Sequence, residues 1–174
     1  LSMYLLNRNM LTRISIILLI LLIVSAFLAP VISPHPKDAQ NATNPEISLQ
    51  GPSQEHLFGT DELGRDILSK TIYGIRISLS SALITVFFAM VIGTLLGAVA
   101  GTVGGVLDEI IMRITDIFLS FPSLLLAIVI SAFLEPSLQH DQMAMVISWW
   151  PWYTRIMRGE AISIKERQYI KAAD

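Results

Sequence analysis

Residues 149–174 read WWPWYTRIMRGEAISIKERQYIKAAD. An apolar segment ends here in four aromatic residues, Arg155 and Arg158 follow, and a polar stretch completes the chain. Aromatic side chains are enriched where a membrane helix meets water, and Lys and Arg are enriched on the cytoplasmic side. This pattern predicts a membrane helix that ends at the cytoplasmic surface and continues into a polar helix suited to docking on a soluble partner.

The composition is that of a membrane protein. Of the 174 residues, 53% are hydrophobic and 15% are charged, and the polar residues form separate blocks between apolar runs, as in chains that cross a bilayer. The formal net charge of -2 gives no basis for nucleic-acid binding. The chain has no cysteine, which excludes disulfides and thiolate metal sites.

Four apolar runs predict four membrane spans and an all-α fold, a polytopic helical bundle. The first run, residues 14–32, would form about 28 Å of helix, close to the roughly 30 Å of a bilayer core. Basic residues before it and small residues near its end would also suit a cleaved signal peptide. Its length and the runs that follow favour a span. The second run is uncharged between Arg76 and Asp108.

The third and fourth runs are shorter. Residues 123–134 would give only about 18 Å of helix, so we expect the third span to occupy residues 117–134 and to kink at Pro122. An amphipathic helix should lead into it, because the apolar residues before it recur on one face. The fourth span needs residues 137–154, which places His140 and Asp141 in its first turn.

The basic residues indicate a cytoplasmic N-terminus. With that orientation the cytoplasmic segments contain eight Lys and Arg residues and the outer segments contain four. Residues 34–77 then form an external loop. Its first part should be irregular, and Thr60 should cap an amphipathic helix with Asp61 and Glu62 in its first turn. Capping and local ion pairing explain this acidic cluster better than acid–base chemistry does.

Glycines recur every fourth residue at Gly93, Gly97, Gly101 and Gly105. Such a ridge lets another helix approach closely, as small-xxx-small patterns do in membranes. Tight packing within one subunit and an adjustable interface are both open, and packing is favoured. Asp141 could line a translocation path or could be an interfacial carboxylate, and the sequence leaves both possibilities open.

The sequence offers no catalytic, cofactor or metal site. His35, His56 and His140 lack the close spacing of metal ligands. The chain contains no GxSxG, no HExxH and no phosphate-binding glycine loop. We therefore expect a protein that is not an enzyme and holds no metal or cofactor.

Several segments together resemble a known family. They are LFGTDELGRDILS at residues 57–69, GIRISL at 74–79, MRITD at 112–116 followed by Phe121-Pro122, and SWWPWYTR at 148–155. In this order they resemble the permease subunits of ATP-binding-cassette importers for dipeptides, oligopeptides and nickel, specifically the second permease of each pair.

The resemblance implies a type I importer permease with six spans, both ends in the cytoplasm, and a coupling helix with an EAA motif after the fourth span. Lys171-Ala172-Ala173 takes the place of that motif, with lysine instead of the usual glutamate. The implied ATPase-docking residues are Glu166, Arg167, Tyr169, Ile170, Lys171, Ala172 and Ala173. Four of the six spans are expected here, which suggests an N-terminal fragment.

The expected organisation has four parts. Residues 1–33 form the cytoplasmic N-terminus and first span, and residues 34–77 form the external loop. Residues 78–158 contain the second to fourth spans, and residues 159–174 begin the coupling helix. The chain would lie in the cell membrane as a multi-pass subunit with its N-terminus in the cytoplasm.

The function implied by the resemblance is ATP-driven import of peptides or nickel. The implied partners are a second permease, two ATPase subunits, an external substrate-binding protein and the lipid bilayer. A self-contained secondary transporter or channel is an alternative, although it would need polar groups deep in several spans. An intramembrane enzyme is a further alternative, which the absence of catalytic pairs disfavours.

Overall fold

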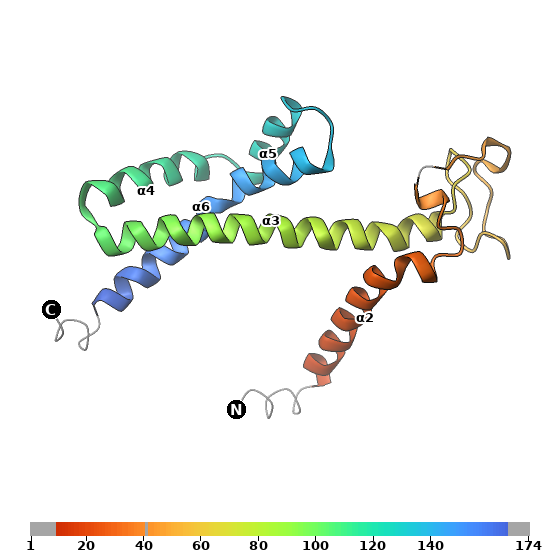
Figure 1. The fold of residues 1–174 in the computed structure, drawn as a ribbon, viewed down its shortest axis with the longest axis horizontal. Helices are drawn as coiled ribbons and strands as arrows, with labels where there is room; N and C mark the ends of the chain where they lie inside the picture. Colours follow the sequence, from red (N-terminus) through yellow and green to blue (C-terminus); the bar gives the residue numbers. More distant parts are fainter. Residues whose placement is uncertain (1–9, 41, 167–174) are drawn as a thin grey trace. The chain divides into compact units, whose positions relative to one another are not determined.

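The computed structural model describes residues 10–40 and 42–166, and this part of the chain is helical (Figure 1). Its elements in chain order are α2 (Met10–Ile32), η1 (Asp38–Gln40), η2 (Pro45–Ile47), α3 (Ile67–Val103), α4 (Gly105–Leu119), α5 (Ser123–Ala132) and α6 (Leu138–Lys165). In these two ranges the extended pairing consists of one isolated bridge, Thr60 with Asp66. The predicted all-α fold is confirmed.

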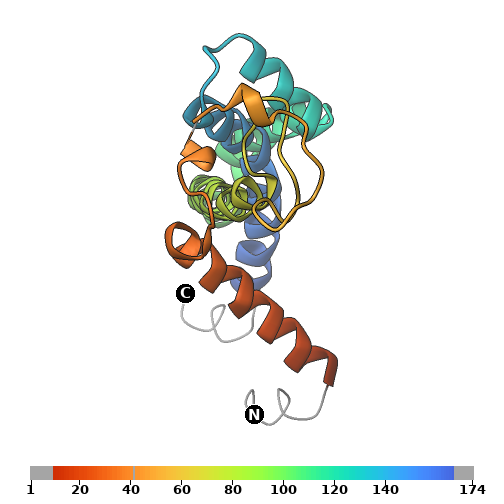
Figure 2. The ribbon, with the colours of Figure 1, turned by 90° about the vertical axis from the view of Figure 1, so that its right-hand side faces the viewer.

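The chain divides into two compact units, residues 1–80 and residues 81–174, with the boundary inside α3. In the first unit, α2 leads into a loop that folds against the first turn of α3. Figure 2 shows this loop in orange and yellow around the beginning of α3. The backbone N–H of Ile67 donates to the carbonyl of Gly59 at 3.1 Å, which fixes the loop to the helix start.

The helix after the loop begins later than the sequence suggested. Residues 60–66 form a turn, and α3 starts at Ile67. Its N-cap is Asp66, whose Oδ2 accepts the backbone N–H of Ser69 at 2.7 Å. The prediction that Thr60 caps the helix is therefore wrong. Thr60 is buried in the loop, where its hydroxyl accepts the N–H of Gln50 at 2.9 Å.

Asp61 organises the same turn. Its carboxylate accepts the backbone N–H groups of Leu63 at 2.9 Å and Arg65 at 3.0 Å, and Lys70 lies 2.6 Å from it. Burial raises the pKa of Asp61, but the hydrogen bonds from Lys70, Arg65 and Leu63 outweigh it and hold this pKa well below its usual range. The predicted local ion pairing is present, although Asp61 lies in a turn and not in a helix.

The second unit contains the rest of α3 with α4, α5 and α6. Two consecutive glycines, Gly104 with φ 70° and Gly105 with φ 61°, reverse the chain between α3 and α4. Both lie in the left-handed region that glycine adopts without a Cβ penalty. After α5, Ser137 caps α6 by accepting the N–H of His140 at 3.1 Å.

The predicted third span is broken. α4 ends at Leu119 and α5 begins at Ser123, and the two helices are bent by 83° at the break. Pro122 explains the break, since proline has no N–H to continue the helix and disfavours helical geometry in the residue before it. Residues 117–134 therefore do not form one kinked helix. They belong to two separate helices, α4 and α5.

Two helices, α2 and α3, are long and apolar enough to cross a membrane, and the bent pair α4–α5 makes a third if it is one span. α6 contains the predicted fourth span but is outside this group, because residues 139–142 are polar and its centre is rich in tryptophan. Length and composition thus identify two or three spans in the described part of the chain, against the four expected.

The apolar core is made of small residues. In residues 10–40 and 42–166 the buried hydrophobic residues are alanines, including Ala89, Ala100, Ala144 and Ala161, whereas the large apolar side chains along α2 and α3 are mostly exposed. A water-soluble fold shows the opposite distribution. Small residues between helices and large apolar residues facing outward are the pattern of membrane helix packing.

Candidate functional site

α3 and α6 lie in close contact at three glycines. A methyl group added to Gly93 would lie 2.5 Å from the backbone oxygen of Trp150, and one added to Gly101 would lie 2.7 Å from the Cβ of Ala161. At Gly97 it would overlap the backbone oxygen of Thr154. Distances of this kind leave no room for a Cβ, so three of the four predicted glycines allow α6 to lie directly against α3.

Gly105 does not belong to this ridge. α3 ends at Val103, Gly105 is the first residue of α4, and open space surrounds the position of its missing side chain. The four-residue spacing of the glycines continues to Gly105, although α3 has already ended at Val103. Gly105 therefore takes no part in the α3–α6 contact.

α6 has a row of buried small side chains, of which Thr154 and Ala161 lie against the glycines of α3. They are Ala144, Ser148, Pro151, Thr154 and Ala161, which follow one another at helical spacing. The hydroxyls of Ser148 and Thr154 donate to backbone carbonyls one turn earlier, at 2.8 and 3.1 Å. Because these polar groups are satisfied within α6, they are buried without an unpaired donor.

Ion pairs join α6 to α4. Arg158 donates from Nε and Nη2 to the two carboxylate oxygens of Asp108, at 2.5 and 2.6 Å. Arg155, one turn earlier on α6, pairs with Asp116, about two turns later on α4. The Arg158 pair is bidentate and partly buried, whereas the Arg155 pair is more than half exposed at both side chains. The bidentate pair therefore fixes α6 more firmly.

The ends of three helices converge around this pair. Lys165, at the end of α6, donates to the carbonyl of Thr102 at the end of α3, at 3.0 Å. Asp108 lies in the first turn of α4. We call Thr102, Asp108, Arg158, Ala161 and Lys165 the helix-end junction. It holds the last two turns of α6 at fixed points on α3 and α4, and the polar segment 166–174 continues directly from it.

Most of the predicted docking segment lies outside the described residues. This applies to Arg167, Tyr169, Ile170, Lys171, Ala172 and Ala173. Glu166 is described: it is exposed and forms the C-cap of α6. The structure thus shows the helix that leads to the docking segment and how that helix is held.

Asp141 lies in the first turn of α6, is exposed, and accepts a hydrogen bond from the hydroxyl of Ser131 in α5. The aromatic girdle lies further along α6. The rings of Trp150 and Phe118 meet edge to face with centroids 5.4 Å apart, and Trp152 donates to Ser123 at 3.4 Å. These contacts connect α6 to α4 and α5 on both sides of the Pro122 break.

Comparison with known proteins identifies the family. Residues 93–174 match the family described as binding-protein-dependent transport system inner membrane component. Residues 3–52 match the N-terminal TM domain of oligopeptide transport permease C. The chain belongs to the binding-protein-dependent transport permeases. The helix-end junction therefore lies in the part of this permease that matches the inner membrane component.

The relatives are peptide permeases by name. This permease is 43% identical to the dipeptide transport system permease protein DppC of Alkalihalophilus pseudofirmus, over 97% of its own length and 54% of the relative. It is 41% identical to DppC of Haemophilus influenzae, over 96% and 57%. It is 38% identical to the probable D,D-dipeptide transport system permease protein DdpC of Escherichia coli, over 98% and 56%. The chain spans about half the length of these curated relatives.

The bidentate pair of this permease was not predicted from the sequence. Asp108 and Arg158 are 50 residues apart. A usable signal exists: the two residues carry charges of opposite sign at the same predicted membrane surface, next to long apolar runs. Charges in such positions tend to pair with one another.

Proposed function

We propose that this permease is a membrane subunit of an ATP-driven importer of dipeptides or oligopeptides. The observation that carries the proposal is 43% identity to a dipeptide permease over 97% of the chain. The names of the relatives favour peptides as the substrate class. In this proposal the subunit itself is not catalytic, and ATP is hydrolysed by partner subunits.

The proposed assembly has a second permease beside this one, two ATPase subunits on the cytoplasmic side and an external substrate-binding protein. The family description, which names binding-protein dependence, supports the external partner. The N-terminus is proposed to be cytoplasmic. In this arrangement residues 34–77 face outward, residues 78–158 form the later spans with α6 covered by α3 and α4, and residues 159–174 begin the coupling segment.

The proposed mechanism uses α6 as a lever. An ATPase subunit bound to residues 166–173 would move the end of α6 when it changes conformation. The helix-end junction would transmit this movement to α3 and α4. The bidentate Arg158–Asp108 pair and the close α3–α6 contact make the three helices move as one body. Rigid-body motion of a bundle is an established way to convert a local change into a global one. Glu166, Arg167 and Lys171 would supply polar contacts, and Tyr169 and Ile170 apolar contacts.

Substitution of Ala172 tests the lever. Ala172→Trp should leave membrane insertion unchanged and reduce ATP-dependent dipeptide uptake at least about tenfold. The bulky side chain would prevent the coupling segment from packing closely against the proposed ATPase subunit. The measurement is uptake by proteoliposomes that contain the complete importer, with and without ATP.

Ala82→Trp is the matched control, since Ala82 is an exposed alanine of α3 in the same chain. It should retain uptake near the wild-type rate. Normal uptake by Ala172→Trp would contradict the docking role, and uptake driven by an ion gradient without ATP would contradict the importer class.

A further inference from the structure

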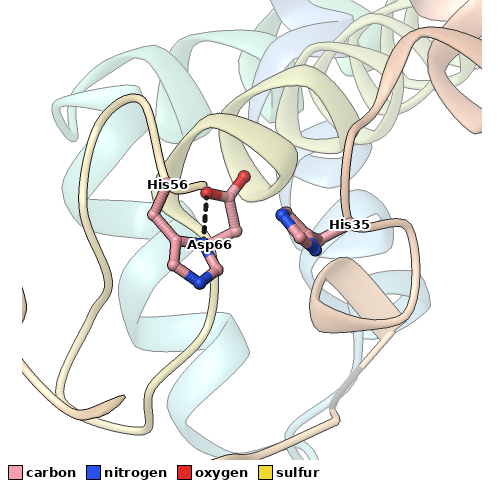
Figure 3. Close-up of side chains that lie close together, drawn as sticks. All are labelled: His35, His56 and Asp66. Atoms are coloured by element: carbon pink, nitrogen blue, oxygen red, sulfur yellow. Dashed lines mark hydrogen bonds and ion pairs between the residues drawn. The ribbon is translucent and has the colours of Figure 1, made fainter. Parts of the chain in front are cut away.

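The loop between α2 and α3 brings three metal-ligating side chains together. His35, His56 and Asp66 each offer one ligand atom, and these atoms all lie within 4.8 Å of one another. Figure 3 shows the Asp66 carboxylate with His56 on one side and His35 on the other. The centroids of the two imidazole rings are 4.7 Å apart. The sequence separations of 21 and 10 residues gave no sign of this cluster.

Backbone contacts hold each member of the cluster in place. The N–H of His35 donates to the hydroxyl of Ser69 in the first turn of α3, at 3.0 Å. The N–H of His56 donates to the hydroxyl of Ser53 at 3.0 Å. Asp66 is fixed as the N-cap of α3. Three separate segments are therefore held around one point by contacts that do not use the imidazole rings.

The cluster is shielded from water and contains an ionised carboxylate. Asp66 is 1% exposed and His56 is 5% exposed, while His35 is partly exposed. Burial raises the pKa of Asp66, but hydrogen bonds from Ser69 and His56 outweigh it, and the net shift is downward. An anionic oxygen in a dry, preformed position is a good ligand for a cation.

The ligand types and spacing suit a late first-row metal. Imidazole and carboxylate together are typical ligands of Zn²⁺, and sites with three protein ligands leave one position for water. His56 Nδ1 lies 3.1 Å from Asp66 Oδ1. Two ligands of a tetrahedral ion with bonds of about 2.0–2.2 Å are separated by about 3.4 Å, which is close to this value. The His35 ligand atom lies within 4.8 Å of the other two, and side-chain rotation would bring it to the same ion.

We propose that His35, His56 and Asp66 bind one divalent transition-metal ion, of which Zn²⁺ is the representative, with water as the fourth ligand. The ion would join the end of α2, the loop and the beginning of α3. Because the folded loop binds the ion and the unfolded loop does not, binding stabilises the loop. The site is independent of the transport proposal and can be tested whatever the substrate.

Zinc titration of the intact permease tests the site. The protein is purified in lipid nanodiscs with a tag that contains no histidine, and ZnCl₂ binding is followed by calorimetry. Wild type should bind one equivalent, and Co²⁺ in place of zinc should give the absorption spectrum of a tetrahedral site. Protease cleavage in residues 42–58 should slow when zinc is added.

Two variants each remove or weaken a single ligand and leave the backbone contacts of the cluster in place. His35→Gln keeps the backbone bond to Ser69 and the His56–Asp66 pair. Asp66→Asn keeps a good N-cap residue. Each should weaken zinc binding at least about tenfold, because one of three ligands is weakened or lost. The matched control is His140→Gln, which alters the remaining histidine of the chain and should leave binding unchanged.

The outcomes separate a metal site from a plain histidine–aspartate hydrogen bond. Absence of stoichiometric zinc binding by wild type would overturn the proposal. Equal affinity of wild type and His35→Gln would also overturn it, since the ion would then be bound elsewhere. Thermal unfolding without zinc shows whether each variant is folded, and the wild-type titration decides the question even if one variant is not.

Discussion

Gly97 shows at the residue scale how closely α3 and α6 approach. Its neighbours across the interface are the backbone oxygen of Thr154 and, 2.9 Å from an added methyl group, the Cβ of Met157. Backbone atoms and Cβ atoms cannot rotate away, so a larger residue has to push the helices apart. Elsewhere in a helix, glycine lowers stability relative to alanine. Here the close contact is what the glycine permits.

Gly97→Ala should lower the free energy of unfolding by about 1–3 kcal/mol, the usual cost of overpacking a tight contact. Gly159→Ala is the matched control, because Gly159 is an exposed position of α6 with open space around it. That variant should be neutral or gain up to about 1 kcal/mol from helix propensity. Both are measured by unfolding in mixed detergent with tryptophan fluorescence. Equal stability of the two variants would show that the helices are not in such close contact.

At the scale of elements, α6 is held to α4 by two pairs of different character. Arg158 and Asp108 form a bidentate pair whose side chains are 34% and 17% exposed, whereas Arg155 and Asp116 are 53% and 54% exposed. Exposed pairs contribute little because water screens them and their side chains lose entropy. The stiffness of the proposed lever should therefore depend on the Arg158 pair.

Arg158→Lys should lower the free energy of unfolding by about 1–2 kcal/mol, because lysine cannot form the two parallel hydrogen bonds of a guanidinium. Arg155→Lys should change it by less than about 0.5 kcal/mol. The same unfolding assay measures both variants. A larger loss for Arg155→Lys would contradict the assignment of the junction to Arg158.

At the scale of the whole molecule, the proposed orientation places residues 34–77 outside and the end of α6 inside. The distribution of basic residues supports it, with eight on the proposed cytoplasmic side and four on the other. The absence of cysteine makes the orientation directly measurable, since any single cysteine introduced becomes the only reactive thiol.

Gln54→Cys and Ser163→Cys should be labelled from opposite sides of the membrane. Both positions are exposed, one in the loop and one near the end of α6. A membrane-impermeant maleimide should modify Gln54→Cys in right-side-out vesicles and Ser163→Cys in inside-out vesicles. Labelling of Ser163→Cys from outside would reverse the topology and remove the basis for ATPase docking.

Local features were predictable from the sequence because they depend on neighbouring residues. Apolar runs of sufficient length predicted the helices α2 and α3, and the length needed for a fourth span placed its beginning at residue 137, where Ser137 caps α6. The glycine spacing predicted a close helix contact at three of four positions. Proline at position 122 predicted an interruption, although its size, a bend of 83°, was not foreseen.

The amino-acid sequence was thus sufficient to show that this chain is helical, that it is apolar enough for a membrane, and which family it resembles, since composition, periodicity and short motifs are properties of adjacent residues. Three contacts became evident only in the folded chain: α6 covers the glycines, Arg158 meets Asp108, and His35 and His56 lie beside Asp66. These contacts join residues 10 to 61 positions apart. They arise from how helices and loops pack in space, and one sequence contains no local record of that packing.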